Sequence, residues 1–183
     1  MAHAFGQEQI APQARAWETM GTIPKDLWPK VADLGLGGIY VSENQGGSGL
    51  GRLDATLIFE ALAMACPSVS AFLSIHNMCG GMIDKYGSED TRARWLPDLC
   101  AMRKVYSYCL TEPGSGSDAA ALSTTAERTN ENYVMNGTKA FISGGSYSDA
   151  YIVMCRTGDK SPKGISALVV EAGNQGLSYG ALE

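Results

Sequence analysis

Residues 104–118, KVYSYCLTEPGSGSD, mark the point at which the pattern of the sequence changes from helical to strand-like. Before this stretch the apolar residues recur at helical spacing. After it, VYSYCLT, ENYVMNGTKAFISG, AYIVMCRT and GISALVVEA alternate or run apolar over strand lengths and are rich in Val, Ile, Tyr and Thr. Helices followed by strands, without βαβ alternation, indicate an α+β protein and exclude a doubly wound nucleotide-binding fold. We therefore predict an all-α helical bundle at residues 1–104 and an antiparallel β-sandwich or barrel-like domain at residues 105–183.

Proline and glycine mark the start and the end of a helical segment in the first part of the chain. Pro24 opens a segment in which Leu27, Val31 and Leu34 recur at i, i+4 and i+7, and Gly35 supplies the expected stop. This pattern predicts an amphipathic helix.

Three further helices follow a polar loop, SENQGGSGLG, at residues 42–51. The first carries an apolar face and ends at Pro67; the residues of that face are Leu57, Ile58, Ala61 and Leu62. The second, SVSAFLSIHNMCGGMIDKYG, is apolar on most sides, which predicts a central position in the bundle. Ser88, with acidic residues directly after it, is an N-cap for the last helix.

The Asn136-Gly137 dipeptide is the strongest local turn signal in the strand-like part. Both residues tolerate the positive φ that a type I′ turn requires. We therefore expect a hairpin from Tyr133 to Ser143.

The composition favours a small-molecule partner. The 183 residues carry a formal net charge of -5 and a pI near 5.0, which argues against an extended basic surface for nucleic acid or anionic lipid. No run of ~18 apolar residues is present, so no membrane-spanning helix is expected. The five cysteines contain no CxxC pair and only two histidines occur, which fits a reducing compartment and leaves a zinc site almost no ligands.

The segment YCLTEPGSGSD, from Tyr108 to Asp118, concentrates the residues that can bind a ligand. Gly114 and Gly116 permit backbone conformations closed to other residues, and hydroxyl donors surround them on Thr111, Ser115 and Ser117. From composition alone, a ligand-binding loop and a solvated β-turn are equally good interpretations.

The order of two segments favours the ligand-binding loop. YCLTEPGSGSD, followed about two dozen residues later by NGTKAFISGG, resembles the paired flavin-binding segments of the acyl-CoA dehydrogenase family. The resemblance extends over essentially the whole chain, including GLGGIYVSENQGGSGLGRLD. The run FEALAMACPSVSAFLSIHNMCGGMIDKYG is similar to the branch that acts on isobutyryl-CoA.

The resemblance implies a set of FAD contacts. The family contacts the isoalloxazine ring at sequence positions that are occupied here by Tyr108, Leu110 and Thr111. Gly116 and Ser117 match the residues that contact the cofactor phosphates, and Ser117 also the CoA part of the substrate.

The second segment contributes the other expected FAD contacts, Phe141, Ile142 and Ser143. Many relatives have Trp and Thr where this chain has Phe141 and Ser143. The two differences retain an aromatic ring and a hydroxyl, so both types of interaction are kept. They put in question how the redox potential of the flavin is tuned, but not whether the flavin binds.

Several other residues are set aside. His76 lies in a mostly apolar helix, where a core histidine is the more common situation. The loop at 42–51 lacks the lysine and spacing of a P-loop, so we interpret it as a connection between helices. Glu43, Glu60 and Glu112 stand outside the family's base position and are expected to be surface or turn residues.

The family's reaction removes an α-proton with a carboxylate while a β-hydride passes to FAD. The resemblance implies that the catalytic glutamate belongs to a carboxyl-terminal helical domain. Both ends of this sequence look trimmed, so we expect that domain to be missing and these 183 residues alone to be inactive. Implied partners are a short acyl-CoA and electron-transfer flavoprotein, in a homotetramer when full length.

Several alternatives remain open at this stage. Butyryl, isobutyryl (in valine degradation) and 2-methylbutyryl thioesters are all candidate substrates. An acyl-CoA oxidase, a nucleic-acid-associated flavoprotein disfavoured by the acidic balance, or a non-catalytic module binding CoA or a protein would share much of the architecture. The family works in the mitochondrial matrix of eukaryotes and the cytoplasm of bacteria, and no transit peptide is visible, which favours a bacterial cytoplasm.

Overall fold

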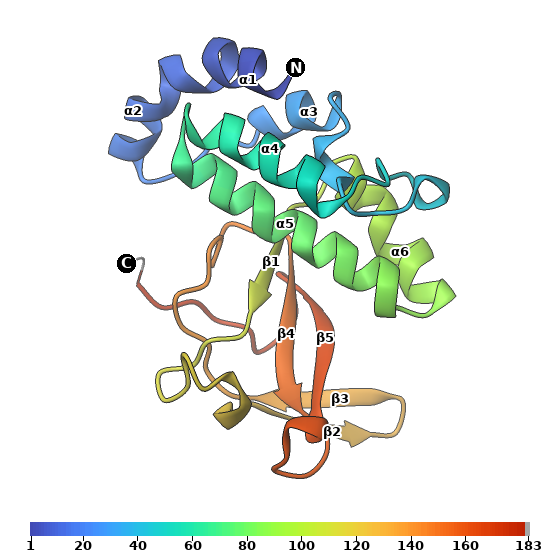
Figure 1. The fold of residues 1–183 in the computed structure, drawn as a ribbon. Helices are drawn as coiled ribbons and strands as arrows, with labels where there is room; N and C mark the ends of the chain where they lie inside the picture. Colours follow the sequence, from blue (N-terminus) through green and yellow to red (C-terminus); the bar gives the residue numbers. More distant parts are fainter. Residues whose placement is uncertain (182–183) are drawn as a thin grey trace. The chain divides into compact units, whose positions relative to one another are not determined.

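The computed structural model describes residues 1–181, which divide into a helical unit, Met1–Val105, and a β unit that begins at Tyr106 (Figure 1). The predicted order of helices first and a sheet second is confirmed. The division falls one residue after the predicted boundary.

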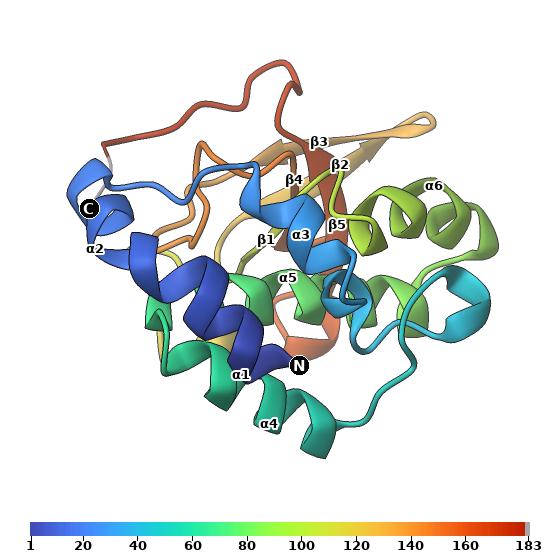
Figure 2. The ribbon, with the colours of Figure 1, turned by 90° about the horizontal axis from the view of Figure 1, so that it is seen from above.

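The helical unit contains six α-helices joined by short 3₁₀ and π-helical turns. Their bounds are α1 Ala2–Phe5, α2 Ala11–Met20, α3 Leu27–Ala32, α4 Arg52–Ala63, α5 Pro67–Tyr86 and α6 Glu89–Cys100. A π-helical turn, η1 (Gly6–Ile10), makes α1 and α2 one continuous run that passes beside α4 (Figure 2). Two 3₁₀ turns, η2 (Leu36–Gly38) and η3 (Glu43–Gln45), lie in the connection between α3 and α4.

Helix α5 is the centre of this unit, as its apolar composition predicts. Phe72 stacks on Trp28 of α3, with ring centroids 5.1 Å apart. Asn77 is fully buried and pins η2: its amide donates to the Leu36 carbonyl at 2.9 Å, and its oxygen accepts from the Ile39 amide at 2.6 Å. A buried polar side chain is tolerated here because its hydrogen-bonding groups are satisfied.

Helix α4 packs through a face that overlaps the predicted one, since Ile58 and Ala61 are half-buried, but is rotated away from Leu57. Leu62 is buried as expected, but Leu57 is 57% exposed, and Ala55 is buried instead. Residues 55 and 62 are separated by two helical turns and share a face, whereas Leu57 points about 200° away from Ala55. Because α4 is apolar on two sides, the sequence pattern alone did not reveal which side meets the core.

The predicted helix ends are confirmed at two places. Gly35 follows α3 with φ 72°, the left-handed conformation that glycine adopts without strain. The Ser88 hydroxyl accepts from the Thr91 amide at 3.2 Å and caps α6.

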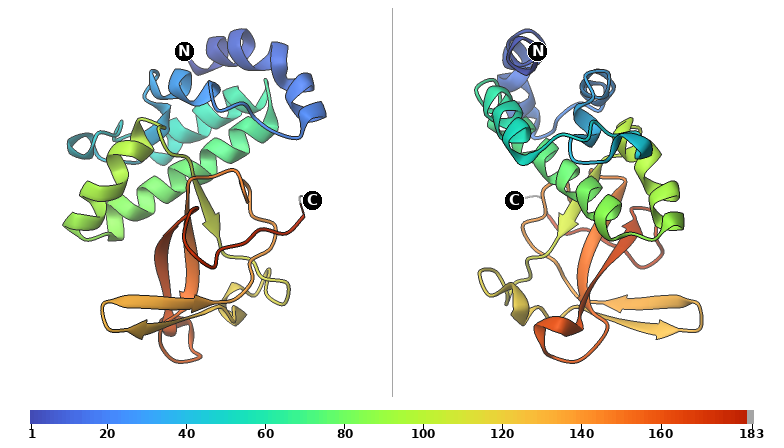
Figure 3. Two further views of the ribbon diagram at one scale, coloured as in Figure 1. Left: turned by 180° about the vertical axis from the view of Figure 1, so that it is seen from behind. Right: turned by 45° about the vertical axis from the view of Figure 1, so that its right-hand side comes forward.

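The β unit is one five-stranded sheet rather than a wholly antiparallel sandwich. The strands are β1 Tyr106–Cys109, β2 Thr125–Thr129, β3 Asn132–Asn136, β4 Ala150–Arg156 and β5 Ile165–Glu171, in the order β1-β4-β2-β3 with β5 also paired to β4. The pairs β2–β3 and β4–β5 are antiparallel, but β1 and β2 run parallel to β4, so the sheet is mixed. Figure 3 shows β4 and β5 side by side and the β2–β3 hairpin extending from them.

The prediction of a hairpin from Tyr133 to Ser143 is wrong. The turn lies at Asn130–Glu131, where Asn130 has φ 55°, and Asn136 instead ends β3. Gly137 is required for a different reason, because a Cβ there would collide with the Thr124 side chain. The residues after it, up to Ser143, form no strand.

Candidate functional site

The two segments that resemble flavin-binding sequences lie against each other in the β unit. The Ala140 amide donates to the Thr111 carbonyl at 2.8 Å. The Lys139 ammonium donates to the Leu110 carbonyl at 2.9 Å. The first segment, which continues from β1, is therefore bonded directly to the second, which follows β3.

A buried ion pair reinforces this junction. Lys139 Nζ lies 2.8 Å from Glu112 Oε1, and the two side chains are only 10% and 4% exposed. The expectation that Glu112 is a surface or turn residue is wrong in this respect. Although Glu112 begins a turn, its carboxylate is turned inward.

The Glu112 carboxylate is fully used inside the protein. One oxygen accepts from the Ser123 amide at 2.6 Å and the Ser123 hydroxyl at 2.7 Å. The other accepts from the Thr124 amide at 2.9 Å and from Lys139. Burial alone would raise the pKa of this carboxyl, but the hydrogen bonds from Lys139, Thr124 and Ser123 outweigh it and hold the pKa well below its usual range. Glu112 is therefore a fixed anion.

The Pro113-Gly114 turn is closed by reciprocal backbone hydrogen bonds between Glu112 and Ser115, at 2.9 and 3.0 Å. Gly114 and Gly116 do not use the wider range of conformations that glycine permits, because neither has a positive φ. A Cβ added at either position would meet nothing within 4 Å. The loop therefore presents an open backbone surface.

Phe141 is the most unusual residue of the second segment. Its φ is 55°, a left-handed conformation that is rare for a bulky residue, and its side chain is 78% exposed. Its neighbours are anchored: Ile142 packs against Cys109, Tyr151 and Val153, and the Ser143 carbonyl accepts from the Ser107 hydroxyl.

The remaining predicted residues also belong to the β unit. Tyr108 lies in β1 and Leu110 follows that strand, both partly exposed. Within residues 1–181, the hydroxyls of Thr111, Ser117 and Ser143 make no hydrogen bond to another protein group. These three hydroxyls are therefore available to an external acceptor.

His76 is a core residue, as expected. It is fully buried, with Nε2 3.1 Å from the Leu99 carbonyl oxygen. Burial lowers the pKa of its imidazole to about 4, against a smaller opposite effect of hydrogen bonds to the Leu99 and Gly37 backbone. The ring is therefore neutral at pH 7.

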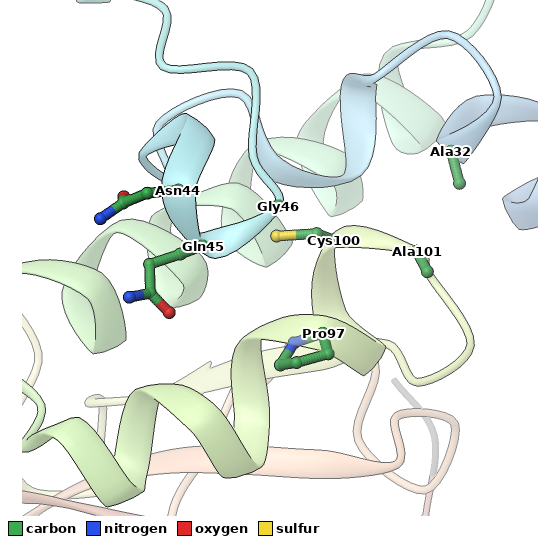
Figure 4. A pocket seen from close by; sticks show the side chains of 7 residues that line it. All are labelled: Ala32, Asn44, Gln45, Gly46, Pro97, Cys100 and Ala101. Atoms are coloured by element: carbon green, nitrogen blue, oxygen red, sulfur yellow. The ribbon is translucent and has the colours of Figure 1, made fainter.

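A hollow of about 540 Å³ in the helical unit contains none of the predicted site residues. It lies between η3 and the end of α6 and is lined by uncharged residues, among them Asn44, Gln45 and Pro97 (Figure 4). Cys100 points into it, but burial, and secondarily Asp84, raise the pKa of that thiol to about 11. The hollow thus offers no charged or nucleophilic group at neutral pH.

Two other kinds of site are not found in the described part of the chain. Residues 1–181 contain no cluster of three or more His, Cys, Asp or Glu side chains suited to hold a metal ion. Over the same residues, no helix combines the length and apolar character needed to cross a membrane.

Comparison with known proteins identifies the family. Residues 1–103 match the acyl-CoA dehydrogenase N-terminal domain, and residues 107–183 match the acyl-CoA dehydrogenase middle domain. The chain is 54% identical to the mitochondrial isobutyryl-CoA dehydrogenase of Bos taurus and 56% identical to that of Dictyostelium discoideum. All of this chain is covered in both, but it spans only 44% of their length.

A solved structure, the FAD complex of PigA, is 30% identical with a TM-score of 0.91, covering 100% of this chain and 49% of that one. Two family domains, in order, thus account for almost every residue. The chain belongs to the acyl-CoA dehydrogenase family.

Proposed function

We propose that the protein is an FAD-dependent dehydrogenase that converts a short, branched acyl-CoA of the isobutyryl-CoA type into the corresponding 2-enoyl-CoA. The observation that carries the proposal is the bonded pair of segments that display Phe141 and three unpaired hydroxyls. The identity of 54% and 56% to two isobutyryl-CoA dehydrogenases favours a branched substrate and hence a role in valine degradation.

The residues present fit a flat cofactor that carries phosphates. Neither the backbone conformation nor crowding within the chain requires glycine at positions 114 and 116. A ligand that approaches the backbone closely would explain why both residues are glycine. Phe141 offers an exposed ring face, and Ser117 an exposed hydroxyl. When bound, FAD would accept the hydride that leaves the acyl β-carbon.

The FAD contacts that we propose are Tyr108, Leu110, Thr111, Gly116, Ser117, Phe141, Ile142 and Ser143. Ser117 would also contact the CoA part of the substrate. The position of Ile142, packed beneath its exposed neighbours, supports a backbone contact rather than a side-chain contact.

We propose no catalytic base among these 183 residues. Glu112, which lies within the first segment, is held by four hydrogen bonds and cannot swing out to take a proton. The base would come from a part of the protein outside this sequence, so residues 1–183 alone should not turn over. Electron-transfer flavoprotein as acceptor, a homotetramer, and a matrix or bacterial cytoplasmic location are further proposals from the family resemblance.

The test is the visible spectrum of the purified full-length protein, recorded before and after anaerobic addition of isobutyryl-CoA. A bound-flavin band that bleaches supports the proposal. Comparing n-butyryl-CoA and 2-methylbutyryl-CoA at equal concentration identifies the preferred acyl chain. A protein without flavin would instead be a non-catalytic module, and a flavin that is reduced but reoxidised rapidly by oxygen would indicate an oxidase.

A further inference from the structure

The Glu112 carboxylate joins three parts of the β unit that are separated in sequence. It sits in the first segment, accepts from Lys139 of the second, and accepts from Ser123 and Thr124 of the stretch that leads into β2. Lys139 in turn bridges Glu112 and the Leu110 carbonyl. The Glu112–Lys139 ion pair therefore fixes how the two segments are aligned with each other, in addition to contributing a contact.

The strained backbone of Phe141 lies in the stretch whose position depends on this alignment of the two segments. Residue 139 is held by its ammonium group and residue 140 by its amide, both on the first segment. On the other side, residue 142 is held by packing and residue 143 by its carbonyl. Between these anchors stands Phe141, in a left-handed conformation and largely exposed. A residue in such a conformation persists only where its surroundings impose it.

Stability alone does not account for a buried ion pair. Removing two charges from water is costly, and uncharged side chains of similar volume can often replace such a pair without loss of stability. The gain from the Glu112–Lys139 pair must then be sought in geometry, since two fully hydrogen-bonded charges tolerate few alternative arrangements.

We infer that Glu112 and Lys139 are positioning residues, whose ion pair holds residues 139–143 against residues 110–112 and so keeps the Phe141 ring presented to the flavin. This inference rests on the proposed function, because it assumes that the ring meets a bound flavin. The inference requires no contact of either side chain with the cofactor. Both act through Phe141.

The test uses the full-length protein and the double variant Glu112→Gln/Lys139→Met. Gln keeps one of the two acceptor oxygens and places an NH2 group where the other stood, and Met keeps most of the lysine volume, so the thermal midpoint should fall less than in a variant that leaves one charge buried and unpaired. The single variant Lys139→Met leaves Glu112 charged, buried and without its cation, and should lower the midpoint. Arg103→Met is the matched control, because it breaks an exposed ion pair with Asp98 in the helical unit.

Three quantities are measured. They are the FAD dissociation constant by flavin fluorescence, the visible circular dichroism of bound FAD, and, without FAD, the hydrogen exchange of the Ala140 amide. We expect the double variant to bind FAD about tenfold more weakly. A loss of this size corresponds to a protein in which only about a tenth of the molecules hold the binding-competent arrangement. Its dichroism should change, and its Ala140 amide should exchange faster, while Arg103→Met matches the wild type.

Two outcomes would overturn the inference. One is a double variant with wild-type FAD affinity, dichroism and Ala140 exchange. The other is a loss of affinity that merely follows a fall in the thermal midpoint, which would make the pair structural. If the wild type itself binds no FAD, the proposed function fails, and Ala140 exchange still decides whether the pair holds the segment.

Discussion

At the scale of single residues, the exposed and strained Phe141 is the clearest sign of a site. Its aromatic character is visible in the sequence, but its left-handed backbone is not, because φ is imposed by anchors on both sides of it. Sequence reasoning identified the residue through family resemblance, and the structure adds a physical reason to assign it a function.

Replacing Phe141 by Gly and by Ala separates the cost of its backbone from the role of its ring. Both variants lose the ring, but only Gly adopts φ 55° without steric cost, so Phe141→Gly should be more stable than Phe141→Ala by about 1 kcal/mol. Chemical denaturation of the two variants checks this. Equal stabilities would mean that the backbone at 141 is not strained in solution. Both variants should bind FAD more weakly than the wild type.

His76 should make stability depend on pH in the range just below neutrality. The folded-state pKa is about 4, against 6.5 for an ordinary imidazole. Between these values the unfolded chain binds a proton that the folded protein does not, so stability is lost as pH falls from 6.5 towards 4. The loss should approach about 3 kcal/mol at the lower end.

Denaturation at pH 7.5, 6.0 and 5.0, in the wild type and in His76→Gln, measures this contribution. The variant should be less stable at pH 7.5 but should show a flatter profile. If the two slopes match over this range, His76 is not the group responsible.

At the scale of elements, helix ends were well predicted because their signals are local. The Ser88 cap contacts an amide only three residues away, and such a contact requires no knowledge of the rest of the fold. The Asn136-Gly137 turn signal failed because Gly137 is fixed by crowding against Thr124, thirteen positions earlier in the chain. The hairpin formed around Asn130 instead, and the second candidate segment was left outside the sheet.

Removal of the Ser88 cap should destabilise α6. Ser88→Ala leaves the Thr91 amide without its acceptor and should cost about 1 kcal/mol of unfolding free energy. Ser68→Ala, at an exposed position in the first turn of α5, is the control and should change stability little. Urea denaturation followed by tryptophan fluorescence is a suitable measurement, because Trp17, Trp28 and Trp95 all belong to the helical unit. A cost equal to that of the control would exclude Ser88 as the cap.

At the scale of the whole molecule, the two units should respond to acid in different ranges. The helical unit contains His76 and should weaken as pH falls below 6.5. The β unit contains Glu112, whose pKa is depressed on folding, so its contribution is present above the ordinary glutamate pKa of 4.5 and is lost as pH falls below that value.

Hydrogen exchange measured at pH 6.5, 5.5 and 4.0, corrected for intrinsic rates, would follow the units separately. Protection should decline first in α5 and α6, and in β1 and β2 only below about pH 4.5. In Glu112→Gln the later decline should be reduced while the earlier one persists. Simultaneous loss throughout the chain, unaffected by this variant, would contradict the assignment.

The sequence by itself determined the order of a helical unit and a β unit, the central position of α5, the cap of α6 and, through its resemblance to a family, the two segments of the candidate site. These features depend on local periodicity, on capping chemistry or on contiguous segments. Only the tertiary structure decided which face of α4 is buried, that β1 and β2 run parallel to β4, and that Glu112 pairs with Lys139. Each of these depends on contacts between residues far apart in the chain, and whether such a contact forms is decided by burial and close packing over the whole unit, which local patterns do not specify.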